Sequence, residues 1–223
     1  MQTVSLGPRQ EAPLLPCVRI RAIHDAARRV DHPLARMVEV ASLIPCNVEH
    51  LASAPLELAD RAARALSVCG PEGLWCDIAF GRFGWEAVER AAGGWTFGAA
   101  IADDDGEALV VNKDAEARAI LLVAAVDPQA VAVPWSFRSL QASMVHQMRR
   151  AGVPDAVISA QTASAMRKAD PAKRSELLAK QTVSADMWAG MLGLWQRPAD
   201  ANGVGRRPFV FQVVVGEGGS DPR

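Results

Sequence analysis

The chain has 223 residues, of which 50% are hydrophobic and 22% charged, and its 24 basic and 25 acidic residues give a formal net charge of −1. A chain of this length and composition can bury its own core, which excludes a largely disordered protein, and its 4 cysteines are too few for a disulfide scaffold. The apolar runs are too short to cross a bilayer and the N-terminus lacks a secretory pattern, so we expect a cytoplasmic protein without membrane contact.

Helical periodicity dominates the N-terminal part of the chain. Apolar spacing predicts helices over residues 14–30 and 34–41, and Asp31-His32-Pro33 is a typical start for the second. The segment Ile44-Pro45-Cys46-Asn47 interrupts the pattern. We then expect a helical run over residues 48–66 that is kinked or split at Pro55, a turn at residues 70–73, and an irregular to helical stretch over residues 75–95.

The C-terminal part combines a predicted hairpin with further helices. Apolar runs on both sides of Asp103-Asp104-Asp105-Gly106 predict a β-hairpin over residues 96–111, and residues 120–126 fit either a strand or a buried helix. Gly152 is a typical helix-ending residue. The remaining pattern predicts helices over residues 136–151, 153–165, 172–180 and 184–195, and a strand over residues 209–215.

Together these elements predict a mostly α fold with a small β-hairpin or sheet, of the α+β class. We expect a single domain over residues 14–215, with a flexible lead-in over residues 1–13 and a tail over residues 216–223. Charge is unevenly divided, because residues 99–135 hold 2 basic and 7 acidic side chains whereas residues 136–180 hold 8 basic and 3 acidic ones. The basic segment either contacts an anionic partner or forms a solvated helical face.

The segment from Phe137 to Gln161 carries a pattern of helix, turn and helix. Leu140, the turn Ala151-Gly152-Val153 and the pair Val157-Ile158 follow one another without a gap. This pattern resembles the C-terminal catalytic segment of tyrosine recombinases, the phage-integrase family. In that family a His-x-Leu-Arg motif opens a helix, and an Ala-Gly-Val turn and a second helix with Val-Ile follow at the same offsets.

An upstream segment resembles the first box of the same family. There an apolar helix runs into Thr-Gly-Leu-Arg-x-x-Glu-Leu, and here the corresponding residues run from Ile44 to Leu51. The family places a β-hairpin with a catalytic lysine between the two boxes. The hairpin predicted over residues 96–111 and Lys113 lie in that interval, so the resemblance covers about residues 14–180 and implies a tyrosine-recombinase-like catalytic domain.

The residues that perform the family's chemistry are replaced in this chain. The resemblance implies a tyrosine nucleophile near Lys173, yet the chain contains no tyrosine. The family also clamps the scissile phosphate with two arginines and moves protons with a lysine and a histidine. The first arginine position is Asn47, the histidine of the second box is Arg138, its arginine is Gln141, and the later Gly-His is Ala163-Ser164.

These substitutions lead to the hypothesis of a catalytically inactive recombinase-like protein. It would act as a DNA-associated accessory or regulatory factor, for example of a mobile genetic element, without a cofactor or a bound metal. Its partners would be double-stranded DNA and an active recombinase or a second copy of itself. The predicted DNA-contacting residues are Asn47, Lys113, Arg138, Gln141, Arg149, Arg150, Arg167 and Lys168.

Two other functions remain open from the sequence. The first is a protein-interaction module without DNA binding, because Trp188, Met191, Leu192 and Trp195 form an apolar helical stripe. By the resemblance to tyrosine recombinases, residues 184–215 would be an element exchanged with a neighbouring protomer, or else they close the protein's own core. The second is a small-molecule enzyme around Cys46, His50 and His146. We expect no zinc site at Cys46, His50, Cys69 and Cys76, because their spacing lacks a Cys-x-x-Cys pair.

Overall fold

The computed structural model describes residues 13–52, 54–55, 58–69, 73, 75–91, 113–163 and 171–195. In this part of the chain the fold is mostly helical with a small two-stranded antiparallel sheet, which confirms the predicted α+β class. The elements are α1 (Cys17–Arg28), α2 (Pro33–Ala41), α3 (Val48–Ala52), β1 (Ala65–Cys69), β2 (Trp75–Ala79), α4 (Gly81–Ala91), α5 (Lys113–Val126), the 3₁₀ helix η4 (Pro128–Val131), α6 (Phe137–Arg150), α7 (Asp155–Gln161) and α8 (Pro171–Met191).

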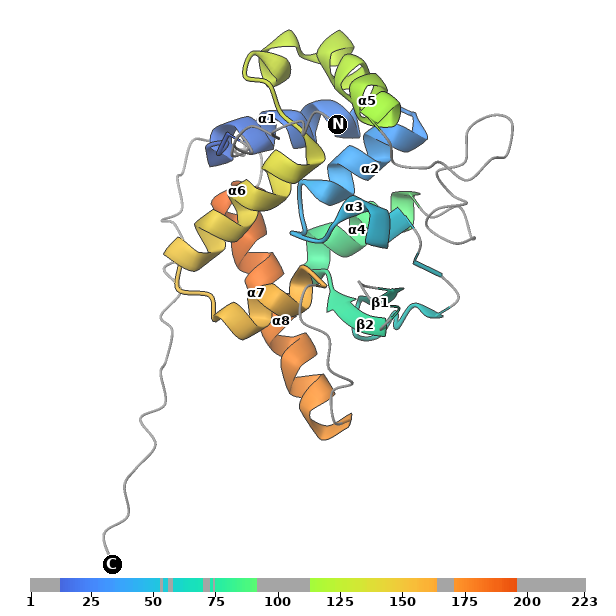
Figure 1. Ribbon diagram of the computed structural model, residues 1–223, viewed down its shortest axis with the longest axis vertical. Helices are drawn as coiled ribbons and strands as arrows, with labels where there is room; N and C mark the ends of the chain where they lie inside the picture. The colour runs from blue at the N-terminus through green and yellow to red at the C-terminus, as the bar shows by residue number, and fades with distance from the viewer. Residues whose placement is uncertain are drawn as a thin grey trace, which may run out of the picture.

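The helices form two groups joined through α4 and α6 (Figure 1). At one end, α1 packs against α2, α5 and η4. At the other end, α8 packs against α7 and β2, and it reaches α4 and α6 between the two groups. Buried apolar side chains from both groups form one continuous core, to which α8 contributes the fully buried Trp188.

Local signals explain where the two best-predicted helices begin and end. Helix α2 starts with Pro33, and the side chain of His32 accepts a hydrogen bond from the Leu34 N–H at 3.1 Å. Helix α6 starts with a capping box between Ser136 and Ser139, and Gly152 follows its end with φ +81°. Both helices therefore confirm the sequence prediction.

The region around the sheet corrects the prediction for residues 58–66 and 75–79. Leu66 lies in β1, where it pairs with Ile78 of β2, and Trp75 begins β2. Leu58 is 56% exposed whereas Leu66 is fully buried, so these residues do not share the apolar face that a helix would have required. The apolar spacing of residues 58–66 also fits a helix, but the pairing between β1 and β2 determines the local structure.

Helix α8 covers the free edge of the sheet with one side chain. Gln181 is fully buried, its Oε1 accepts a hydrogen bond from the Ala79 N–H at 2.9 Å, and its Nε2 donates to the Asp77 carbonyl at 3.2 Å. These two backbone groups are those that a neighbouring strand would pair with. One amide side chain therefore takes the place of a third strand.

Three further predictions are corrected or resolved in the C-terminal half. The predicted helices over residues 172–180 and 184–195 merge into the single helix α8, because residues 181–183 contain no helix-breaking residue, and α8 ends at Met191, before the predicted limit. Helix α7 is shorter than predicted and ends before Ala163, which has φ +55°. Residues 120–126 belong to helix α5, whose Ala115, Ala119 and Val123 are buried while Leu121 is exposed.

Several predicted segments lie outside the described residues. They are the lead-in, the hairpin over residues 96–111, the strand over residues 209–215 and the tail. Among the helices of the described ranges, none combines the length and apolar character needed to cross a membrane.

Candidate functional site

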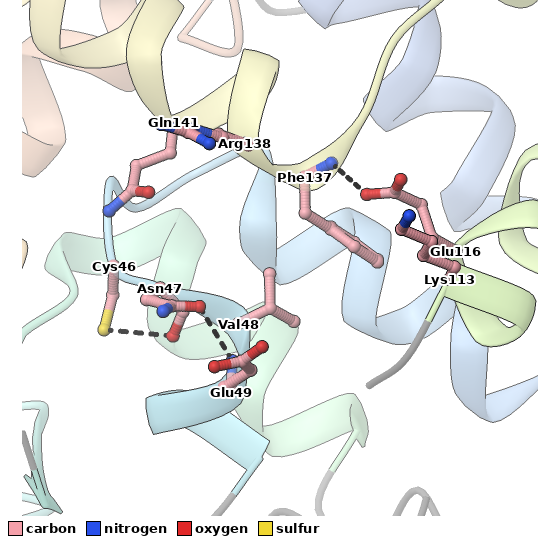
Figure 2. Close-up of a pocket in the computed structure, with 9 residues that line it drawn as sticks. All are labelled: Cys46, Asn47, Val48, Glu49, Lys113, Glu116, Phe137, Arg138 and Gln141. Carbon is pink, nitrogen blue, oxygen red and sulfur yellow. Dashed lines mark hydrogen bonds between the residues drawn. The ribbon is translucent and has the colours of Figure 1, made fainter. Parts of the chain in front are cut away.

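A pocket of about 650 Å³ opens between the loop before α3, the start of α5 and the start of α6 (Figure 2). It is assembled from parts of the chain that are far apart in sequence. Its lining residues are Cys46, Asn47, Val48, Glu49, Lys113, Glu116, Phe137, Arg138 and Gln141. The volume falls in the range typical of small-ligand sites.

The loop that breaks the helical pattern forms one wall. Asn47 directly precedes α3, and its Oδ1 accepts a hydrogen bond from the Glu49 N–H at 3.1 Å. The neighbouring Cys46 is buried, and burial followed by the nearby Cys76 thiol raises the pKa of Cys46 far above its ordinary value. Cys46 is therefore a neutral thiol and not an activated nucleophile.

Two side-chain contacts fix the opposite wall. The Phe137 N–H, at the start of α6, donates to Glu116 Oε2 of α5 at 2.8 Å. Gln141 Nε2, one turn further along α6, donates to the Pro45 carbonyl at 3.0 Å. The start of α6 is thus tied to α5 on one side and to the loop before α3 on the other (Figure 2).

The charges of the described residues that line the pocket are balanced. Lys113 and Arg138 supply two cations, and Glu49 and Glu116 supply two carboxylates, so the formal sum over these lining residues is zero. Within the described ranges, neither cation forms an ion pair or a side-chain hydrogen bond. Both side chains are therefore available to a ligand, because no carboxylate in the described structure competes for them.

The structure brings four of the predicted site residues together. Asn47, Lys113, Arg138 and Gln141 come from three separate segments and line this pocket. Sequence reasoning missed Glu49, Glu116 and Phe137. Glu116 lies one helical turn after Lys113, so a helical reading of residues 113–126 would have placed it beside that lysine.

The other predicted contact residues do not line the pocket. Arg149 and Arg150 lie exposed in the last turn of α6, and Arg149 Nε is 3.0 Å from Asp155 Oδ1. Arg167 and Lys168 are outside the described residues. Lys173, the position at which the resemblance implies the nucleophile, lies in the first turn of α8 and is not among the lining residues.

The cysteines and histidines of the alternative metal and enzyme sites do not form one metal-binding cluster among the described residues. In the ranges that the structure describes, no group of three or more His, Cys, Asp or Glu side chains could hold a metal ion. Cys69 and Cys76 lie on β1 and β2 but are not directly opposite each other, because Cys69 pairs with Trp75. His146 is exposed on α6, away from the pocket lining.

The tryptophan stripe belongs largely to the protein's own core, which is one of the two alternatives given above. Trp188 is fully buried and its Nε1 donates to the Ser42 carbonyl at 2.9 Å. Leu192 is buried as well. Trp195 is 46% exposed but packs edge-on against Phe83, with ring centroids 4.9 Å apart.

No protein-family model and no curated protein sequence matches this chain. The resemblance to tyrosine recombinases consequently rests on the two boxes of residues described above.

Proposed function

We propose that this chain is a catalytically inactive tyrosine-recombinase-like protein that associates with double-stranded DNA as an accessory or regulatory factor. Its partner in that role would be an active recombinase or a second copy of itself, for example in a mobile genetic element. One observation carries the proposal: four positions that the resemblance assigns to a single site lie around one pocket.

The support comes from the sequence separation of those positions. Asn47 precedes α3, Lys113 begins α5, and Arg138 and Gln141 lie in the first turns of α6. The resemblance selects Asn47, Arg138 and Gln141 by motif offsets, and Lys113 by its place just beyond the predicted hairpin. Their convergence on one pocket is what a recombinase-like arrangement requires, and unrelated positions would rarely meet in this way.

The absence of catalysis follows from the residues present. A chain without tyrosine cannot form the family's phosphotyrosyl bond. Both clamp arginine positions hold amides, Asn47 and Gln141, which cannot supply the charge that a phosphoryl transition state needs. The buried thiol of Cys46 offers no substitute nucleophile, because burial keeps it protonated.

The cations on α6 provide a surface for a phosphate backbone. Arg138 and Arg149 are separated by about three helical turns, so they share one face of α6 at roughly 16 Å along its axis. Lys113 lies at the pocket next to the start of this helix. Such a limited set of cations fits modest, salt-dependent binding and not the strong binding of a highly basic protein.

Fluorescence anisotropy with a random-sequence duplex tests this proposal. Three cations in contact with phosphates, Lys113, Arg138 and Arg149, predict a log–log salt slope of about −3, so raising salt from about 50 to 200 mM should weaken binding roughly fortyfold. The double variant Arg138→Ala/Arg149→Ala should reduce the magnitude of that slope by about two. The charge-matched control Arg28→Ala/Lys180→Ala, on α1 and α8, should leave the slope unchanged.

Three results would overturn the proposal. The first is the absence of binding at the lower salt concentration, and the second is an equal loss in the two double variants. The third is nicking of a supercoiled plasmid by the purified protein, which would show that the chain retains catalysis.

A further inference from the structure

We propose that the pocket binds a small zwitterion of the amino-acid class, whose carboxylate pairs with Lys113 and Arg138 and whose ammonium group pairs with Glu49 and Glu116. This inference does not depend on DNA binding, since it concerns a free small molecule and the balanced charge of the pocket itself. It follows from three properties of the lining residues.

The first property is the pair of available cations. Lys113 comes from α5 and Arg138 from α6, so they approach the pocket from two different elements (Figure 2). Neither side chain has a partner among the described residues. A ligand carboxylate would give both of them a charge-assisted hydrogen bond, and the planar guanidinium of Arg138 suits two carboxylate oxygens at once.

The second property is the pair of carboxylates. Glu116 uses Oε2 to accept the hydrogen bond from the Phe137 N–H, which holds its side chain in place and leaves Oε1 free. Glu49 is exposed and pairs with no cation of the described structure. A zwitterion gives both the cations and the carboxylates of the lining an oppositely charged partner.

The third property is the mixture of remaining groups. Gln141 Nε2 donates to the Pro45 carbonyl, so its Oε1 has no partner among the described residues and can accept a hydrogen bond. Asn47 Oδ1 accepts from the Glu49 N–H, so its Nδ2 has no partner among the described residues and can donate one. Val48 and Phe137 add apolar surface to the lining. A few polar groups of both kinds beside an apolar wall are typical of sites that orient a small amphiphilic ligand.

Three related probes separate the contributions of the two ligand charges. Isothermal titration calorimetry would compare L-phenylalanine with L-phenylalaninamide, which lacks the carboxylate, and with N-acetyl-L-phenylalanine, which lacks the ammonium group. We expect the zwitterion to bind with a dissociation constant in about the millimolar range or tighter, and each singly charged probe to bind at least about tenfold more weakly.

Variants assign each charge to its partner. Arg138→Gln should weaken L-phenylalanine at least about fivefold while leaving L-phenylalaninamide unchanged, because the amide has no carboxylate to lose. Glu49→Gln should weaken L-phenylalanine by a similar factor and leave N-acetyl-L-phenylalanine unchanged. Arg28→Gln, on α1, is the matched control for charge removal and should affect none of the probes. Thermal melting checks that each variant is folded.

Several outcomes would overturn the inference. If N-acetyl-L-phenylalanine binds as tightly as L-phenylalanine, the pocket is a simple anion site. If no probe binds, or if binding survives in both pocket variants, the pocket has no zwitterion site. Because DNA binding is measured separately, failure here leaves the proposed function standing, and loss of DNA binding leaves this inference standing.

Discussion

A buried amide links the small sheet to the longest helix of the described structure, in addition to the ion pair between Arg174 of α8 and Asp77 of β2. Gln181 of α8 bonds both the Ala79 N–H and the Asp77 carbonyl of β2, and its own backbone carbonyl accepts from Gln161 Nε2 at 3.1 Å. A leucine of similar size would fill the space without offering a donor or an acceptor. The buried N–H of Ala79 would then have no partner.

We therefore expect Gln181→Leu to lower the free energy of unfolding by about 2 kcal/mol, the cost of leaving a buried backbone donor unpaired. The measurement is urea-induced unfolding followed by circular dichroism. Lys180→Leu makes the same replacement at the preceding, exposed position, where only a surface pair with Glu176 is lost, so a change below about 0.5 kcal/mol is expected. Equal losses in the two variants would show that the amide has no special role.

At the scale of elements, glycines at positive φ set the boundaries of two helices in different surroundings. Gly81, at the start of α4, has φ +59°, and a Cβ there would lie 2.6 Å from Asp186 Oδ1. The same Oδ1 accepts a hydrogen bond from the Arg82 N–H at 2.9 Å, so α8 caps the start of α4. Gly152, after α6, has φ +81° and nothing within 4 Å of a built Cβ.

This difference predicts unequal costs for the same substitution. Gly152→Ala should cost about 1 kcal/mol, because only the left-handed backbone is strained. Gly81→Ala should cost about 3 kcal/mol or more, because the new methyl group also displaces the carboxylate that caps α4. Chemical denaturation of both variants provides the comparison. Similar losses would mean that the Asp186 cap contributes nothing measurable.

The elements that could be predicted are those whose signals are local. Helix α6 carries its own capping residue, Ser136, and its own terminator, Gly152, so its limits follow from the sequence. Strand β1 carries no such signal, because Leu66 is in a strand only through its pairing with Ile78. The division of α8 into two helices was wrong because residues 181–183 give no reason to end a helix.

The same reasoning applies to the pocket. Asn47, Lys113, Arg138 and Gln141 could be selected from the sequence because motif offsets of the resemblance point to them. Helical spacing could have placed Glu116 beside Lys113, but its hydrogen bond from the Phe137 N–H, which joins α5 to α6, follows only from the fold. The sequence thus predicted which polar positions meet, and the structure adds the acidic residues that balance them.

At the scale of the whole molecule, buried thiols link stability to alkaline pH. Burial, followed by the neighbouring Asp77 and Cys69, raises the pKa of Cys76 from 9.0 to about 11. The pKa of Cys46 is raised as well, mainly by burial. The folded state therefore keeps these protons more firmly than the unfolded chain does, and the stabilisation is complete below the unfolded pKa and is lost as pH rises through the folded one.

We expect the free energy of unfolding to fall between about pH 9 and about pH 11, with a contribution from Cys76 on the order of 1 kcal/mol after allowance for its partial exposure. Denaturation at about pH 7 and about pH 10.5 measures the effect. The Cys76→Ala variant should show a smaller difference in the free energy of unfolding between these two pH values, whatever the stability of the variant at neutral pH. An unchanged difference in this variant would contradict the assignment.

The placement of Gln181 also bears on how copies of this protein behave toward one another. An open strand edge is a template onto which another strand can add, and on β2 that edge is filled from within the same chain. Self-association along this edge first requires α8 to detach and uncover the Ala79 N–H and the Asp77 carbonyl together. Exposure of this edge thus depends on the release of α8, which is held in the core by the fully buried Trp188.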